Sequence, residues 1–122
     1  MTGISVSEAA AKVGLTTHTL RWYEQEGLVE PVVRDAAGRR RYQPADLDRL
    51  VLLTKLRSTG MSVRDMRRYA ELIAGGETTF PERLALLEAH RIQVLARIEE
   101  LRRDLETVDY KIGLYRSSVP CT

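Results

Sequence analysis

The first 27 residues place apolar side chains at helical spacing in two short runs, each bounded by capping residues. Ser5 followed by Glu8 has the spacing of a capping box, and Gly14 is suited to end that helix. Thr16 or Thr17 can cap a second helix, which would stop at the glycine at position 27. The pattern predicts a helix, a short turn and a second helix over residues 5–27.

A change to β-prone residues follows, and then two more helical runs. Val32–Arg34 and Arg40–Tyr42 flank a turn-forming segment, which predicts a small β-hairpin. Pro44 suits the first turn of a third helix, whose leucines at positions 47, 50, 53 and 56 form an apolar stripe. Ser62 begins a fourth predicted helix, which ends at two glycines, at positions 75 and 76.

The longest uninterrupted helical pattern begins at Pro81. Apolar residues recur there at alternating intervals of three and four, interrupted only by Arg91. These apolar positions are Leu84, Leu87, Val94, Ile98, Leu101, Leu105, Val108, Ile112 and Tyr115. Five heptads exceed an ordinary globular helix, so we expect a coiled-coil dimerisation helix over residues 81–116. An intramolecular helical hairpin is the alternative, and Arg91 is either a snorkelling side chain or a register device.

Composition narrows the class of protein. The chain is 43% apolar and 30% charged, and no apolar run approaches the roughly 20 residues that cross a bilayer. The N-terminal segment lacks the basic and apolar regions of a secretory signal, and the single cysteine, Cys121, excludes an intrachain disulfide. We therefore expect a soluble, cytoplasmic protein with no membrane partner.

The net charge of +2 conceals an uneven distribution. Residues 1–75 hold 12 Lys and Arg against 9 Asp and Glu, whereas residues 76–122 hold 7 against 8. Four arginines and one acid lie between Arg34 and Arg41, and such a patch can bind a polyanion. A solvated loop is the alternative interpretation.

The stretch THTLRWYEQEGL, residues 17–28, contains the second predicted helix, which has two different faces. Leu20 faces the first helix, and Tyr23 lies beside it. Arginine binds guanine edges or phosphates, and a tyrosine hydroxyl can reach a phosphate while its ring stays packed. These are the properties of a DNA-recognition helix. The outward face carries His18, Arg21, Trp22 and Gln25.

The predicted hairpin adds a second basic element directly after this helix. It carries Arg39, Arg40, Arg41 and Tyr42. Together the two elements predict a winged helix-turn-helix, in which the helix enters a major groove and the wing contacts flanking backbone or minor groove. In the alternative, Arg21 and Trp22 lie over a neighbouring helix as a cation–π lid.

Four segments, taken in order, carry a resemblance to a known family. They are ISVSEAAAKVGLTTHTLRWYEQEGL, a wing ending GRRRYQPADLDRL, the run LRSTGMSVRDMRRYAEL and the long helix. The chain resembles MerR-family transcriptional regulators over nearly its whole length, and LRWYEQEGL with GRRRY is a highly specific pair. Trp22 stands where the family usually has tyrosine, and it keeps an N–H donor. The resemblance implies DNA contacts from Thr17, His18, Arg21 and Tyr23 on the helix and from Arg40 and Tyr42 on the wing.

The resemblance also implies how such a protein acts. A homodimer whose long helices pair antiparallel would place two winged domains on a pseudopalindromic promoter. The dimer would bend and untwist the promoter spacer so that RNA polymerase can use both promoter elements. Distorting the DNA costs on the order of several kcal/mol, which the protein contacts must offset.

The residues offer little for sensing an effector. The chain stops soon after the long helix, in a short tail over residues 117–122, so we expect no drug-binding domain. One cysteine and two separated histidines do not make a metal site, and we expect no cofactor. We interpret His18 as a surface contact and His90 as an exposed helix residue. Cys121 is a candidate redox or electrophile sensor, and an inert tail residue is the alternative.

These patterns combine into one prediction of fold and function. The expected fold is mostly α, with four helices and a β-hairpin wing over residues 1–76, and then the coiled-coil helix. No paired carboxylates, nucleophile–base pair or phosphate-binding glycine loop indicates an enzyme. The expected function is sequence-specific regulation of transcription at promoter DNA. A coiled-coil protein–protein adaptor without specific DNA binding is the alternative.

Overall fold

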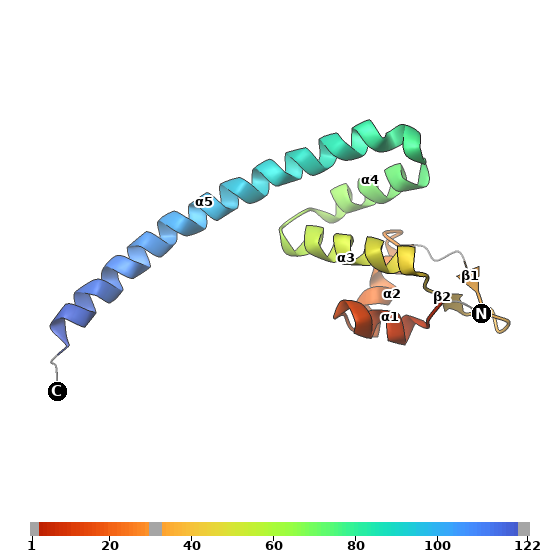
Figure 1. Ribbon diagram of the computed structural model, residues 1–122, viewed down its shortest axis with the longest axis horizontal. Helices are drawn as coiled ribbons and strands as arrows, with labels where there is room; N and C mark the ends of the chain where they lie inside the picture. The colour runs from red at the N-terminus through yellow and green to blue at the C-terminus, as the bar shows by residue number, and fades with distance from the viewer. Residues whose placement is uncertain (1–2, 30–32, 120–122) are drawn as a thin grey trace. The chain divides into compact units, whose positions relative to one another are not determined.

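The computed structural model of the chain describes residues 3–29 and 33–119 (Figure 1). These residues form five α-helices, one short 3-10 helix and a two-stranded sheet. The mostly helical fold with a long C-terminal helix is confirmed. The chain divides into two compact units, Met1–Leu86 and Leu87–Thr122.

Helices α1 (Val6–Val13) and α2 (Thr17–Gln25) form the predicted helix-turn-helix. The hydroxyl of Ser5 caps α1 by accepting from the backbone N–H of Glu8, and Gly14 ends the helix in the left-handed conformation. Of the two candidate threonines, Thr16 caps α2, because its extended backbone lets the hydroxyl accept from the N–H of Thr19. The two caps set where each helix begins.

A short hairpin, the wing, follows α2. Strand β1 (Val33–Arg34) pairs antiparallel with β2 (Arg40–Arg41). The N-terminal segment joins this sheet, because Ile4 and Tyr42 exchange backbone hydrogen bonds of 2.9 and 2.8 Å. Val32, which the sequence analysis assigned to the first strand, lies outside the described residues.

Helices α3 (Pro44–Ser58) and α4 (Val63–Ala74) complete the core of the first unit. Pro44 occupies the first turn of α3, and Ser62 caps α4, as the sequence predicts. An ion pair between Glu26 and Arg67 joins the end of α2 to α4. The largest fully buried side chains are Leu20, Leu28, Val29, Tyr42, Leu50, Leu53 and Met66.

An elbow, defined here as residues 75–83, leads from α4 into the last helix. Gly75 follows α4, and Gly76 adopts φ 82° and ψ −166°, a conformation that only glycine adopts readily. One turn of 3-10 helix, η1 (Glu77–Thr79), comes next. Helix α5 (Phe80–Ser118) then runs for 39 residues, starting one residue before the proline at position 81.

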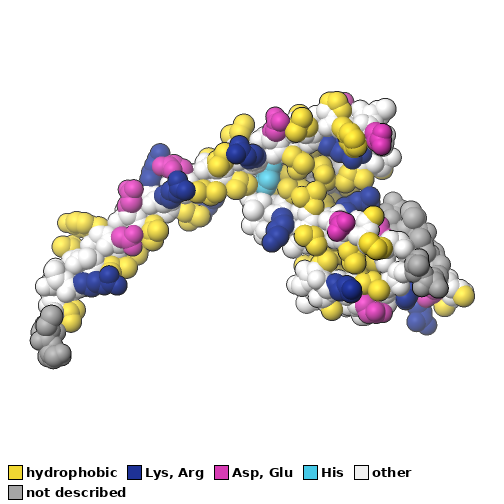
Figure 2. Space-filling model, viewed as in Figure 1, with side chains coloured by type: hydrophobic (Ala, Val, Ile, Leu, Met, Phe, Trp, Pro, Cys, Tyr) yellow, Lys and Arg dark blue, Asp and Glu magenta, His cyan; other side chains and the backbone are white. Residues whose placement is uncertain are grey.

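Helix α5 exposes most of the apolar seam found in the sequence. Figure 2 shows hydrophobic side chains at the surface along the helix. Two seam residues near its start, Leu87 and Val94, are half-buried. The other seven are between 40% and 61% exposed: Leu84, Ile98, Leu101, Leu105, Val108, Ile112 and Tyr115.

The expectation for His90 is wrong. Its side chain is buried, with 9% of the residue exposed. Four more residues on the same side of α5, at intervals of three and four, are partly shielded. They are Arg83, Leu86, Leu87 and Val94. This shielded face shares Leu87 and Val94 with the predicted seam but is otherwise rotated from it, and the heptad count did not reveal the burial of His90 because His90 is not a seam position.

Candidate nucleic-acid interface

Helix α2 separates its side chains by role, as its sequence predicts. Leu20 and Tyr23 are buried in the core, whereas His18 and Arg21 are exposed. Thr17 and Trp22 are half-buried. Because successive residues turn by about 100°, the buried pair and the exposed pair fall on different faces. The outward face is therefore free to carry polar contacts.

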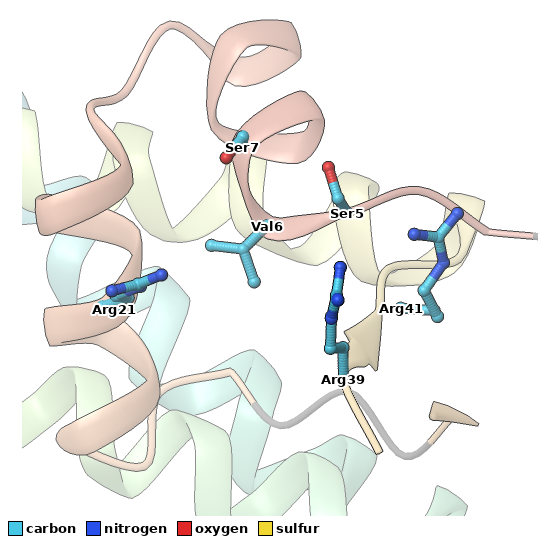
Figure 3. Close-up of a pocket in the computed structure, with 6 residues that line it drawn as sticks. All are labelled: Ser5, Val6, Ser7, Arg21, Arg39 and Arg41. Atoms are coloured by element: carbon cyan, nitrogen blue, oxygen red, sulfur yellow. The ribbon is translucent and has the colours of Figure 1, made fainter. Parts of the chain in front are cut away.

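Arg21 faces a basic cleft that three parts of the first unit build together (Figure 3). The cleft has a volume of about 380 Å³, and it is lined by Ser5, Val6, Ser7, Arg21, Arg39 and Arg41. In Figure 3, Arg21 enters from α2 and Arg39 from the wing, with the serines at the start of α1 beside them. The sequence predicted the arginines, but it did not predict that Ser5 and Ser7 lie with them.

The start of α1 adds to the positive character of this basic cleft. The N-terminus of a helix carries a partial positive charge and N–H groups that have no partner within the helix. Such an end attracts anions, and here three guanidinium groups share its surroundings. The cleft therefore has the chemistry of a phosphate-binding site.

The turn of the wing positions Arg39. One carboxylate oxygen of Asp35 accepts hydrogen bonds from the backbone N–H groups of Ala37 and Arg39, both at 2.9 Å. Gly38 adopts φ 80°, which favours glycine. Arg40 and Arg41 form β2. One donor of Arg41 is used within the protein, since its Nη2 donates to the carbonyl of Gly3 at 2.8 Å.

Tyr42 is buried, unlike a residue that contacts DNA from the protein surface. It is only 1% exposed, and its hydroxyl donates to a carboxylate oxygen of Glu24 at 2.7 Å. This hydrogen bond links Tyr42, which follows β2, to α2. Sequence reasoning recognised Tyr42 as part of the wing but not this link, because Glu24 lies 18 positions away.

A second pocket beside α2 contains a residue that the sequence analysis missed. It has a volume of about 290 Å³ and is lined by His18, Thr19, Trp22, Tyr23 and Arg57. The guanidinium of Arg57, on α3, lies 5.2 Å from the centre of the Trp22 ring. Trp22 therefore makes a cation–π contact with a neighbouring helix, as the alternative interpretation supposed. The cation is Arg57, however, and Arg21 faces the basic cleft.

Neither a metal cluster nor a membrane helix is found in the described part of the chain. Within residues 3–29 and 33–119, no three His, Cys, Asp or Glu side chains gather where they could hold a metal ion. In the same residues, no helix is long and apolar enough to cross a membrane. Cys121, the candidate sensor, lies outside the described residues.

The helix-turn-helix, the wing and the basic cleft define a winged helix-turn-helix DNA-binding protein. Comparison with known proteins identifies the family to which it belongs. Residues 4–72 match the model of the MerR HTH family regulatory proteins, and residues 47–108 match the MerR DNA-binding model. The chain belongs to the MerR family.

Individual relatives agree over most of the chain. A helix-turn-helix transcriptional regulator of Haemophilus influenzae is 41% identical over 93% of this chain and 84% of its own. HiNmlR, a MerR family regulator lacking the sensor domain and crystallised with promoter DNA, is 40% identical with a TM-score of 0.87, over 95% of this chain and 92% of its own. A putative MerR family regulator from Listeria monocytogenes is 32% identical with a TM-score of 0.87, covering 93% and 86%. This chain is a MerR-type DNA-binding transcriptional regulator.

Proposed function

We propose that this regulator acts in the cytoplasm as a homodimer that reads a pseudopalindromic promoter and has no enzymatic activity. Helix α2 enters the major groove of each half-site, and the wing lies on the adjoining backbone. The basic cleft carries this proposal, since three arginines and a helix N-terminus converge where a backbone phosphate would bind. HiNmlR, which shares the fold and was crystallised with promoter DNA, favours this function over a protein adaptor.

The residues of the interface divide between reading bases and holding phosphates. Thr17 and His18 lie on the outward side of α2 and contact the DNA in the groove, and Arg21 reaches a base edge or a phosphate from the basic cleft. The wing arginines hold the backbone. The aromatic residues support these contacts from below the surface. Trp22 is half-buried, and Tyr23 and Tyr42 are buried.

The dimer forms through α5. Its seam leaves seven large apolar side chains between 40% and 61% exposed in the single chain, and a second copy covers them. Such a coiled coil buries each apolar side chain among four residues of the partner helix. The dimer then presents two recognition helices to the two half-sites.

The charges beside the seam favour an antiparallel pair. In a parallel pair, Arg97 would face Arg102 of the partner subunit, and Asp104 would face the partner subunit's Asp109. Lys111 would likewise face Arg116 of the partner subunit, and the two copies of Arg91 would share one layer of the seam. Like charges at these positions repel, so antiparallel pairing, which separates them, is preferred.

A single-cysteine experiment tests the direction of pairing. In a Cys121→Ser background, Tyr115→Cys places one thiol near the end of the seam. Parallel helices would bring the two thiols together, and oxidised glutathione would link the chains. Antiparallel helices keep them apart, so we expect no linked dimer, although sedimentation shows dimers in the same buffer. A linked dimer in high yield would contradict the antiparallel arrangement.

At the promoter, the dimer acts by deforming DNA. It bends and untwists the spacer between the promoter elements so that RNA polymerase engages both of them. The cost of deformation depends on the sequence of the spacer, which adds specificity at bases that the protein does not touch.

Fluorescence anisotropy of labelled DNA tests the function as a whole. The probes are the DNA upstream of the protein's own gene and a scrambled duplex of the same length, each titrated across a salt series. We expect tight binding to the upstream DNA, with two chains per duplex and a steep dependence on salt. Equal, weak binding to both duplexes would contradict specific recognition of this promoter.

A further inference from the structure

Arg83, in the second turn of α5, binds back onto the end of α4 within the same compact unit. Its Nη2 lies 2.8 Å from the carbonyl oxygen of Gly76, 3.2 Å from that of Leu72 and 3.3 Å from that of Ile73. Its Nε donates to the hydroxyl of Thr79 at 2.9 Å. Because these donors are used in hydrogen bonds within the protein, Arg83 is poorly suited to bind DNA.

The contacts of Arg83 satisfy a specific need at this place. The last carbonyl groups of a helix have no partners within the helix, and they carry a partial negative charge. Arg83 supplies both hydrogen bonds and a positive charge to the end of α4. The hydroxyl of Thr79 adds to the same network by donating to the carbonyl of Leu72, and the Arg83 guanidinium stacks 4.8 Å from the centre of the Phe80 ring.

The backbone of the elbow depends on two glycines. At the φ and ψ of Gly76, a residue with a side chain would be strained. At Gly75, a Cβ atom would lie 2.8 Å from a methyl carbon of Thr79, closer than side chains pack. The two glycines allow the backbone to take this conformation, and the hydrogen bonds of Arg83 and Thr79 hold the chain there between α4 and the start of α5.

We propose that Arg83 is a positioning residue, which stiffens the elbow and thereby sets the spacing of DNA half-sites that the regulator accepts. This inference rests on the proposed function as a DNA-binding dimer. Helix α5 is continuous, and at 1.5 Å per residue it is on the order of 60 Å long. A tilt of roughly 10° in its first turns displaces its far end by about 10 Å, whereas one base pair advances DNA by about 3.4 Å. A stiff elbow makes the dimer selective for one spacing.

The test uses duplexes carrying the half-sites selected from a random pool by the wild-type protein. In separate duplexes, the centre is shortened or lengthened by one and by two base pairs. We expect wild-type affinity to fall about tenfold or more for a change of one base pair. Arg83→Gln and Thr79→Val, which each remove part of the network, should reduce this penalty to about threefold or less.

Arg103→Gln is the matched control. Arg103 is an exposed arginine in the middle of α5, on the side of the helix away from the predicted seam, and an ion pair of 3.8 Å joins it to Glu99. It should keep the wild-type spacing profile. Sedimentation and circular dichroism of each variant show whether it remains a folded dimer, and Arg83→Lys, which keeps the charge but offers one donor group, should give an intermediate profile.

Three results would overturn the inference. An unchanged spacing profile in folded Arg83→Gln and Thr79→Val would make the network purely structural. An equal loss at every spacing, with a smaller salt slope, would make Arg83 a phosphate contact. If the wild-type protein selects no half-sites at all, the proposed function fails, and the inference fails with it.

Discussion

Neighbouring residues on α2 have distinct surroundings, and these decide what each can do. Leu20 is buried, Arg21 faces the basic cleft, and Trp22 packs against Arg57. The first two placements follow from helical periodicity, so the sequence predicted them. The contact with Arg57 did not follow, because it depends on how α3 packs beside α2.

Replacing Arg21 with alanine should weaken binding to the cognate site by about 1–3 kcal/mol. The exposed guanidinium stands in the cleft, where it reaches either a base edge or a phosphate. Anisotropy titrations at fixed salt measure the loss. Arg68→Ala, which removes an exposed arginine of α4, is the control and should bind as wild type. Unchanged affinity of Arg21→Ala would remove Arg21 from the interface.

Reversing the charge of Arg39 should weaken binding to cognate and random DNA alike. A wing residue that holds phosphates reads no sequence, so the change should also lower the salt slope by about 1–2. Titrations of both duplexes at several salt concentrations measure these effects. A loss confined to the cognate duplex would show instead that Arg39 reads bases.

Tyr42→Phe should lower the free energy of unfolding by about 1–3 kcal/mol, because it removes a partly buried hydrogen bond to a carboxylate. Urea denaturation followed by circular dichroism measures the change. Tyr110→Phe, at a tyrosine that is 70% exposed on α5, is the control and should leave stability unchanged. Equal stability of the two variants would mean that the link from Tyr42 to Glu24 contributes little.

Local signals in the sequence determine most of the elements. Ser5, Pro44 and Ser62 start helices where capping and proline geometry predict them, and the wing forms around its turn residues. The elbow was not predicted in this detail, since Arg83 reaches carbonyl groups up to 11 positions earlier across a turn. Contacts of this kind depend on tertiary packing, which a periodic pattern does not report.

The cap of α2 gives a prediction for this element. Thr16→Ala should lower the free energy of unfolding by about 1 kcal/mol, because the N–H of Thr19 loses its acceptor. Thr17→Ala is the matched control, since Thr17 is already inside the helix, and it should cost less. Chemical denaturation of both variants decides between the two threonines. A larger loss for Thr17→Ala would contradict the assigned cap.

For the whole molecule, the exposed seam of α5 is the main reason to expect a dimer. A single chain leaves an apolar stripe in contact with water from Leu84 to Tyr115, and the hydrophobic effect favours covering it. The sequence predicted this seam through its heptads. The burial of His90 was missed, because His90 lies beside the seam rather than on it.

Replacing Ile98 and Leu105 with aspartate should convert the dimer to a monomer. Both residues lie in the seam, and two charges in each helix would be buried without partners on pairing. Sedimentation velocity measures the change in mass. Ile92→Asp with Tyr110→Asp, two exposed residues outside the predicted seam, is the matched control and should remain dimeric. A persistent dimer in the seam variant would contradict this interface.

Trp22 is the single tryptophan of the chain, and it lies on the proposed recognition helix, α2, with its ring beside Arg57. Its indole emission therefore reports on this one place in the molecule. A phosphate that draws Arg57 away, or a base that stacks near the ring, would change the intensity or wavelength of that emission. The unlabelled regulator thus carries its own optical probe, through which docking on DNA can be followed in real time.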